Sequence, residues 1–189
     1  MKAKFIQKEI CYTGKELSPH WIYKKFGIEG DVIISFIGEC NVKLDNMLDL
    51  SDVLSNSPIY SKKMLHFMVE HFNISLIEGI LRQRLLVNIA KEVISANSPG
   101  LTIIRRGDDL FYEEGKLSVS IAAKSINSVL IHLGINIDSA NAPVKAAGLE
   151  SEIKMNLKNI QQIANDIINK YCLENEQIIK ASCKVKGVI

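Results

Sequence analysis

The sequence has 189 residues, of which 47% are apolar and 23% are charged, and its 23 basic and 21 acidic residues give a net charge of +2. This near balance neither indicates nor excludes a nucleic-acid partner. No apolar run reaches the roughly 20 residues that span a bilayer, and the charged start MKAKFIQKEI is unlike a signal peptide. We therefore expect a cytoplasmic protein without a membrane partner.

The first part of the chain predicts short elements separated by glycine and proline. A helix is expected where Ser18 and Pro19 open a segment that Gly27 closes, and strands are expected where apolar residues alternate or form β-branched runs. The expected elements are a strand at 4–12, a helix at 18–27 and a strand at Asp31–Leu44.

The middle of the chain predicts helices. The segment LSDVL at 50–54 is expected to form one helical turn. Within Ser61–Phe72, four apolar residues fall on one face at helical spacing, which predicts an amphipathic helix. Apolar residues at three- and four-residue steps predict a longer helix at Leu76–Ala96.

The last part predicts a run of strands, then a helix and a final strand. The expected elements are strands at Leu101–Tyr112, Lys116–Ala123 and Ser128–Asp138, a helix capped by Ser151 that runs to Cys172, and a strand at 178–189. Hairpin-linked strands with intervening helices predict an α+β fold, with a largely antiparallel sheet and helices packed on it. With no repeat or linker to divide it, the chain is expected to form a single domain over residues 1–189.

The four cysteines predict neither a zinc site nor a disulfide framework, because they lie far apart and form no CxxC pair. Cys11 and Cys183 lie in runs that suggest burial. Glu39 and Cys40, in IGEC, follow a glycine at a strand end and could face a cleft, although a buried structural thiol is the commoner case. We expect Cys40 to lie near a pocket without acting as a covalent catalyst, since a neighbouring carboxylate raises the pKa of a thiol.

The segment RRGDDLFYEEGKLSVSI, which begins at Arg105, carries the most informative charges. Lys116 stands at the head of an apolar strand, seven residues after Asp109 and eleven after Arg105. A lysine there is a compact charge that can pair with a carboxylate or a phosphate in a partly desolvated pocket. The alternative is that Lys116 is a solvent-exposed turn residue without a functional role. Asp108 and Asp109 are either turn residues or partners that orient Arg105 and Arg106.

The order and spacing of this segment resemble the signature of biotin protein ligases, in which a basic residue, Trp, Pro, Asn, Asp and Leu are followed by five residues and a Lys. In that family the lysine contacts the carboxylate and phosphate region of the acyl-adenylate. The resemblance implies that Lys116 is the catalytic residue that binds the acid, that Arg105 lies beside a phosphate, and that ATP with Mg²⁺ is the co-substrate. We expect the polar ends of Arg105, Asp109 and Lys116 to face one cleft.

The downstream sequence resembles octanoyl and lipoyl transferases, in which the same lysine is followed by a strand, a loop, a strand of the form HGxxLN and a proline-containing loop. Here HLGINID begins at His132 and APVKAAG begins at Ala142. The resemblance adds His132 and Asn136 to the expected ligand-binding residues. Along its whole length the chain resembles a mainly archaeal family, domain of unknown function 366. This implies a fold similar to the biotin and lipoate ligase catalytic domain and to that of class II aminoacyl-tRNA synthetases.

The sequence also differs from those families in three features. The ligases have a Gly- and Arg-rich loop over the phosphates, and nothing in residues 1–101 looks like it. Ala147 aligns with the transferase cysteine that forms an acyl thioester, and Val119 stands where the ligases have a glycine. Without the cysteine, thioester transfer by the family route is not expected.

His66 and His71 lie five residues apart, so on the predicted helix they lie on different faces, and the zinc pattern HExxH is absent. No metal site is predicted among the protein side chains.

The sequence thus favours an enzyme that activates a small carboxylic acid with ATP or transfers it to a protein or RNA acceptor. The first alternative is a non-catalytic nucleotide- or RNA-binding module with the same fold. The second is a structural partner protein that kept the fold and lost the pocket. The oligomeric state is open, and a homodimer is compatible with the sequence.

Overall fold

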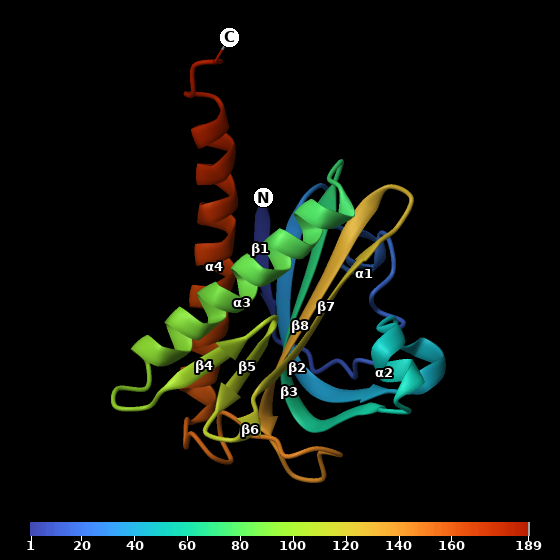
Figure 1. Cartoon of the computed structure of the whole chain (residues 1–189), viewed down its shortest axis with the longest axis vertical. Coiled ribbons are helices and arrows are strands. Elements are labelled where there is room, and N and C mark those ends of the chain that lie inside the picture. The colour runs from blue at the N-terminus through green and yellow to red at the C-terminus, as the bar shows by residue number, and fades with distance from the viewer. Residues whose placement is uncertain (189) are drawn as a thin grey trace.

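The computed structural model describes residues 1–188 and contains two β-sheets with helices packed around them (Figure 1). The larger sheet has five strands in the order β1-β2-β3-β8-β7, in which β1 runs parallel to β2 and the other neighbours are antiparallel. Its strands are β1 (Lys2–Ile6), β2 (Val32–Val42), β3 (Ile59–Phe72), β7 (Ser118–Lys124) and β8 (Ser128–Asp138).

The smaller sheet has three antiparallel strands, β4 (Ile103–Arg106), β5 (Asp109–Tyr112) and β6 (Gly115–Lys116). The helices are α1 (Trp21–Phe26), α2 (Leu50–Leu54), α3 (Leu76–Ala96) and α4 (Leu157–Ser182), with a 3₁₀ turn, η1, at Leu44–Asn46. The α+β class and the largely antiparallel sheet are confirmed, and the expected bounds of α2, α3 and β8 agree with the structure.

The prediction of a helix at Ser61–Phe72 is wrong, because this segment is the long central strand β3. From Met64 to His71 every side chain is buried, since β3 pairs on both edges and is covered on both faces. A strand buried on both faces shows no alternation of apolar and polar residues, so its pattern cannot be told from that of a helix.

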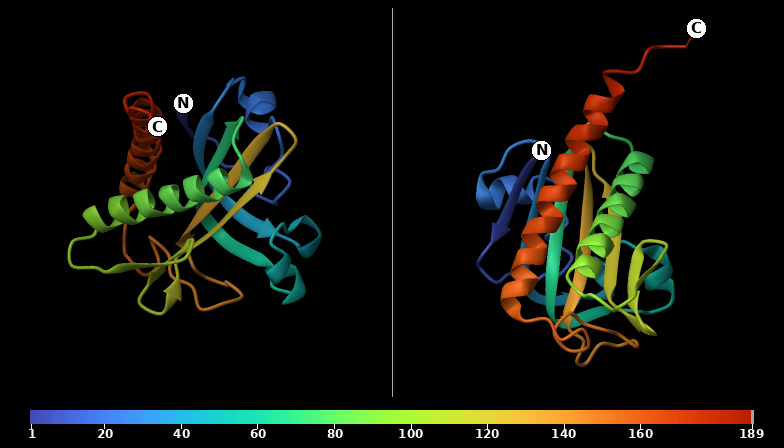
Figure 2. Two further views of the ribbon diagram at one scale, coloured as in Figure 1. Left: turned by 45° about the horizontal axis from the view of Figure 1, so that its top comes forward. Right: turned by 90° about the vertical axis from the view of Figure 1, so that its left-hand side faces the viewer.

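The prediction of a C-terminal strand at 178–189 is also wrong over the described residues, because α4 continues to Ser182; Ile189 lies outside them. The helix is capped by Asn156, whose side chain accepts a hydrogen bond from the backbone N–H of Asn159 at 2.9 Å, and not by Ser151. The C-terminal part of α4 extends past the sheet (Figures 1 and 2).

The expected strands at Leu101–Tyr112 and Lys116–Ala123 are each shorter or broken. The first is a hairpin of β4 and β5 that turns at Gly107, which has a positive φ of 65°. The second breaks at Leu117, so that β6 belongs to the small sheet and β7 to the large one. Lys116 therefore lies where the chain passes from one sheet to the other.

The large sheet separates two apolar cores. On one face, α3 and α4 lie side by side and cover the sheet (Figure 2), and the core on this face includes Leu86, Ile163 and Ile167. On the other face, the segment from Ile6 to Ile28, which includes α1, packs on Phe36 and Met68.

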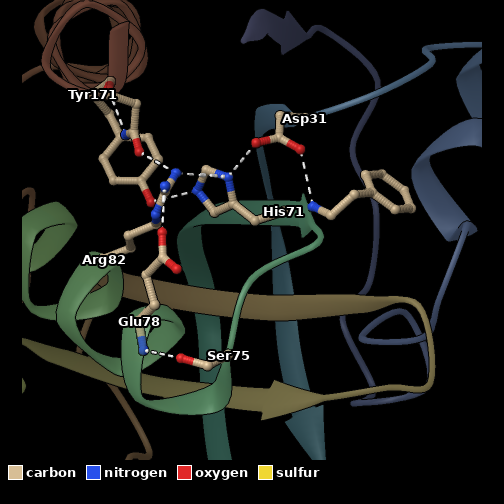
Figure 3. A network of polar contacts seen from close by, with 8 residues as sticks. Asp31, His71, Ser75, Glu78, Arg82 and Tyr171 are labelled. Atoms are coloured by element: carbon tan, nitrogen blue, oxygen red, sulfur yellow. Dashed lines mark hydrogen bonds and ion pairs between the residues drawn. The ribbon is translucent and has the colours of Figure 1, made fainter. Parts of the chain in front are cut away.

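Figure 3 shows a polar network that joins α3 and α4 to the end of β3. His71 Nδ1 lies 2.8 Å from Asp31 Oδ2, and His71 Nε2 lies 2.9 Å from the hydroxyl of Tyr171 on α4. Arg82 on α3 donates to Asn175 Oδ1 on α4 at 2.7 Å. These bonds connect the two helices to each other and to the sheet.

Candidate functional site

A cavity of about 320 Å³ opens on the sheet face opposite α3 and α4. Its wall is built from the segment before α1, the ends of β2 and β3, the η1–α2 region, the start of β5, strands β6 to β8 and the loop after β8. This volume falls at the lower end of the range typical of small-molecule sites, roughly 300–1,000 Å³. The apolar part of the wall includes Leu17, Val42, Met64 and Ile121.

Lys116 is fixed at the edge of this cavity by its backbone. Its N–H donates to the carbonyl of Lys145 at 2.9 Å, and its own carbonyl accepts from the N–H of Ala147 at 3.0 Å. The side-chain amide of Asn136, on β8, also donates to the Lys116 carbonyl at 3.1 Å. The proline-containing loop and β8 thus hold the backbone of Lys116 in place at the cavity wall.

The side chain of Lys116 pairs with Asp109, the two charged groups lying 2.8 Å apart. Burial raises the pKa of Asp109, and the nearby carboxylates of Asp108 and Asp52 add to this, while the bond to Lys116 works against it. Hydrogen bonds from Ser51 lower the pKa of the Asp49 carboxyl, and the charge of Lys116 adds to the effect. Lys116 and the aspartates around it therefore influence one another's pKa and form one charged cluster.

The cavity lining is acidic overall. Four carboxylates line it, from Asp49, Asp52, Asp108 and Asp109, whereas Lys116 is the only lysine or arginine among the described residues that do so. Asp108 has two further partners outside the lining. Gln83 Nε2 on α3 donates to it at 3.0 Å, and a guanidinium nitrogen of Arg84 lies 4.0 Å away.

His132 forms the polar floor of the cavity, and His66 supports it from behind. His132 on β8 lines the cavity, and its Nε2 lies 3.0 Å from Nδ1 of the fully buried His66 on β3. Tyr12 stacks on the His132 ring with 3.9 Å between ring centroids. Burial lowers the pKa of His66 to about 3 and that of His132 well below its usual 6.5, so both imidazoles are neutral at pH 7.

The hydrogen bonds determine the tautomers of these two rings. His66 Nε2 faces the carbonyl of Gly38 at 3.3 Å and must carry the proton, because a carbonyl only accepts. Nδ1 of the neutral His66 is then an acceptor, so the proton between the rings is on His132 Nε2. A neutral His132 consequently has a bare lone pair on Nδ1.

A missing side chain makes room for this histidine pair. Gly134 lies directly opposite His66 in the β3–β8 register. A Cβ atom built on Gly134 would approach Met64 Sδ to 2.3 Å and His132 Cε1 to 3.2 Å. Any larger residue there would displace the floor.

Cys40 lines the cavity but is fully buried, and burial is the main cause that raises its pKa to about 12. Its thiol is therefore protonated at neutral pH. The glycine before it has a packing reason, because a Cβ on Gly38 would lie 1.9 Å from the carbonyl oxygen of Ile10. The expectation that Cys11 and Cys183 are buried is wrong, since both are exposed.

Six of the nine expected site residues line the cavity: Cys40, Asp108, Asp109, Lys116, His132 and Asn136. Three others, Arg105, Arg106 and Glu39, are exposed and do not line it.

The expectation that Arg105 shares a cleft with Asp109 and Lys116 is wrong. Arg105 pairs with Leu110, and Asp109 pairs with Arg106, so Arg105 and Asp109 lie on opposite faces of the small sheet. Arg105 donates instead to the carbonyl of Gly107.

The other two residues outside the cavity have neighbours of their own. The guanidinium of Arg106 stands over the ring of Phe111, 4.9 Å from its centroid. The carboxylate of Glu39 accepts a hydrogen bond from the side-chain amide of Asn41 at 3.3 Å.

Sequence reasoning missed Tyr12, Asp49 and Asp52 as cavity residues, and His66 as the partner behind His132. Asp49 carried a local signal, since an Asp before a short helix is a typical N-cap, but nothing in the sequence near it indicates a cavity. His66 and Tyr12 reach the floor only through pairing between distant strands.

Over residues 1–188, no group of three His, Cys, Asp or Glu side chains is arranged to hold a metal ion. No helix in this part of the chain is long and apolar enough to cross a membrane.

Among solved structures, a protein of unknown function from Pyrococcus horikoshi is similar over the whole of both chains, with 31% identity and a TM-score of 0.90. A candidate lipoate protein ligase from T. acidophilum with bound lipoic acid is similar over 91% of this chain and 86% of its own, with 12% identity and a TM-score of 0.62. A biotin protein ligase from Aquifex aeolicus, in complex with biotin and ATP, is similar over 89% of this chain and 70% of its own, with 13% identity and a TM-score of 0.55. The two ligase likenesses show the fold alone.

Relatives in sequence give the family. An uncharacterised protein of Methanocaldococcus jannaschii is 42% identical over 184 residues, which cover 94% of this chain and 81% of the relative. The model of the family described as domain of unknown function 366 (DUF366) matches residues 1–186. The chain therefore belongs to the DUF366 family, and its fold is that of the biotin and lipoate protein ligases.

Proposed function

We propose that the cavity binds a small carboxylic acid, that Lys116 holds its carboxylate, and that the protein activates the acid with ATP for transfer to a protein or RNA acceptor. The observation that carries the proposal is the position of Lys116, the only lysine or arginine among the described lining residues. The spacing of its segment also resembles the biotin ligase signature at the lysine, and the fold is shared with proteins that bind lipoic acid, biotin and ATP.

In the proposed reaction, the main task of the protein is to position the acid and ATP. A carboxylate oxygen of the acid attacks the α-phosphorus of ATP, the bond from that phosphorus to the bridging oxygen breaks, and pyrophosphate leaves. A nucleophile on the acceptor then attacks the acyl carbon, loses its proton, and AMP leaves. Lys116 would hold the negative carboxylate and face the charge that develops on the phosphate.

Asp109 gives Lys116 its orientation in the free protein. The ion pair at 2.8 Å uses one of the three N–H donors of the ammonium, so two remain for a ligand. Asn136 acts through the backbone, since its side-chain amide donates to the Lys116 carbonyl. We infer that Asn136 is a positioning residue.

The lining fits the triphosphate of ATP only together with Mg²⁺, because one lysine cannot balance the phosphates and the acidic residues. Carboxylate oxygens are the donors that Mg²⁺ prefers, and the ion is commonly held by one or two carboxylates together with phosphates and waters. Asp49 and Asp52 would hold it here, both on the cavity wall at the N-terminal end of α2. Mg²⁺ would neutralise charge on the phosphates.

The test is ATP–pyrophosphate exchange with a panel of small carboxylic acids, comparing the natural chain with Lys116→Ala. The matched control is Lys145→Ala, since Lys145 is exposed in the neighbouring loop and lies outside the cavity. Acid-dependent exchange that Lys116→Ala reduces about a hundredfold, and Lys145→Ala leaves unchanged, is the expected result.

Equal exchange rates in Lys116→Ala and Lys145→Ala would show that Lys116 takes no part in the reaction. Binding of nucleotide or RNA without any exchange, measured by thermal shift, would instead support the non-catalytic binding module.

A further inference from the structure

The floor of the cavity presents two polar atoms without partners. The hydroxyl of Tyr12 and Nδ1 of His132 have no hydrogen bond within residues 1–188, although both side chains are 97% buried (3% exposed each). Among these residues, the side-chain polar atoms that are both sealed and unpartnered are the hydroxyls of Ser35 and Ser98. The Tyr12 and His132 atoms are therefore reached by solvent, through the cavity that both residues line.

The histidine at this floor can only accept. The chain of hydrogen bonds from the Gly38 carbonyl through His66 leaves a lone pair on His132 Nδ1. The Tyr12 hydroxyl can donate or accept, and its pKa is raised well above the usual value by burial, so it keeps its proton. A bound molecule must bring an N–H or O–H donor to satisfy His132.

The surrounding charge indicates which donor fits. Asp49 and Asp52 would serve Mg²⁺, Lys116 already pairs with Asp109, and Arg84 lies 4.0 Å from Asp108 outside the lining, so the described cations at the cavity already face carboxylates. A ligand that carries only a carboxylate adds a further negative charge. A ligand that also carries a protonated amine adds no net charge and supplies N–H donors.

We propose that the acid bound in this cavity is an amino-bearing carboxylic acid, whose carboxylate pairs with Lys116 and whose ammonium donates to His132 on the floor. This inference rests on the proposed function for the carboxylate end and on the His132 and Tyr12 atoms for the amine end. A hydrocarbon chain, as in lipoate or octanoate, would leave the His132 lone pair buried without a donor, which is costly.

The experiment measures binding of four six-carbon acids to the full chain by ligand-detected and protein-detected NMR. Norleucine carries its amine next to the carboxylate, and 6-aminohexanoate carries it at the far end of the chain. In 6-hydroxyhexanoate a neutral hydroxyl donor replaces that amine, and hexanoate has no donor besides its carboxyl group. We expect at least one of the amines to bind about tenfold or more tightly than hexanoate, with the hydroxy acid between them.

The variants separate the two ends of the ligand. His132→Phe removes the acceptor and should abolish the preference for the amine. Because this buried substitution can affect folding, Tyr12→Phe provides a second test that keeps the ring stacked and removes one open hydroxyl, and it should reduce the preference severalfold. Tyr23→Phe is the matched control, since Tyr23 is half exposed on α1 and lies away from the cavity.

The outcomes distinguish the inference from the proposed function. Hexanoate binding that depends on Lys116 and equals amine binding would overturn the inference and leave the proposed function intact. If Lys116→Ala does not weaken binding of the amino acids, Lys116 does not bind the carboxylate, whereas the proposed contact between the amine and His132 would stand. No binding of any of the four acids at about 10 mM would count against both.

Discussion

Two buried histidines on strand β3, His66 and His71, are in opposite situations. They lie five residues apart, so on a strand they face opposite sides of the sheet. His71 faces the helices, where Asp31 and Tyr171 engage both of its nitrogens (Figure 3). His66 faces the side of the sheet that holds the cavity and bonds to His132, which lines the cavity and whose Nδ1 has no partner among the described residues.

This difference separates a stabilising network from a binding surface. A buried polar group is normally satisfied, and a closed network such as that of His71 fixes the elements that it joins. A buried polar group left open toward a cavity costs stability until a ligand satisfies it. The two faces of β3 therefore serve different roles, and substitutions on each face should have different consequences.

The largest expected effect is on the helix side. His71→Ala leaves the Tyr171 hydroxyl and part of the Asp31 carboxylate without their partner and creates a void, so the free energy of unfolding should fall by about 3 kcal/mol. Urea denaturation measures this change. A loss of less than about 1 kcal/mol would show that the network is not a stabilising element.

A pair of tyrosines sharpens the comparison. Tyr171→Phe removes the hydroxyl that is hydrogen-bonded to His71 Nε2 and should cost about 1–3 kcal/mol, whereas Tyr12→Phe removes a hydroxyl without a described partner and should stay within about 0.5 kcal/mol. Thermal and urea unfolding of the two variants decide the point. Equal losses would contradict the distinction between the closed and the open face.

Acid titration should separate the two faces by pH. The pKa of folded His66 is lowered to about 3, below its usual 6.5, so the unfolded chain takes up the proton first and stability falls as the pH drops from about 6.5 towards 3. Burial raises the pKa of Asp31, but its hydrogen bonds from His71 and the Phe72 N–H, with nearby positive charge, lower it below 3.8 overall. Its contribution is therefore present above pH 3.8 and is lost at lower pH, as the carboxylate is protonated.

These two windows can be observed by unfolding experiments at a series of pH values. Asp31→Asn should flatten only the part of the curve below about pH 4 and leave the slope between pH 6.5 and 4 unchanged. A stability that is constant between pH 6.5 and 4 would contradict the buried neutral state of His66 and His132.

The smallest effect concerns the thiols. Cys11 and Cys183 are exposed, whereas burial is the main cause that raises the pKa of Cys40 to about 12 and of Cys172 to about 11. A mild alkylating reagent should therefore label the two exposed thiols first, as read by mass spectrometry of the folded protein. Faster labelling of Cys40 than of Cys183, with an acyl adduct on Cys40, would restore a covalent mechanism.

The sequence predicted those features that have a local pattern. Helix α3 is predicted because its apolar residues recur at helical steps, and Lys116 is singled out because its segment resembles the biotin ligase signature. Strand β3 was mistaken for a helix because burial on both faces removes the alternation that marks a strand.

The site was predictable only where its residues belong to one segment. Asp109 and Lys116 are joined by a short hairpin, but the His66–His132 pair depends on the register of β3 and β8, and on Gly134 opposite His66. The face of Arg105 likewise depends on a register that spacing alone does not reveal. Long-range pairing therefore accounts for what the sequence did not show.

The most direct measurement is the nitrogen NMR spectrum of the histidine side chains, with and without norleucine. We predict that, in the free protein, the single ring proton of His66 and of His132 lies on Nε2, and that His132 Nδ1 shifts when norleucine is added. A proton on Nδ1 of His132 in the free protein, or a His132 resonance that does not respond to a bound amine, would contradict this prediction.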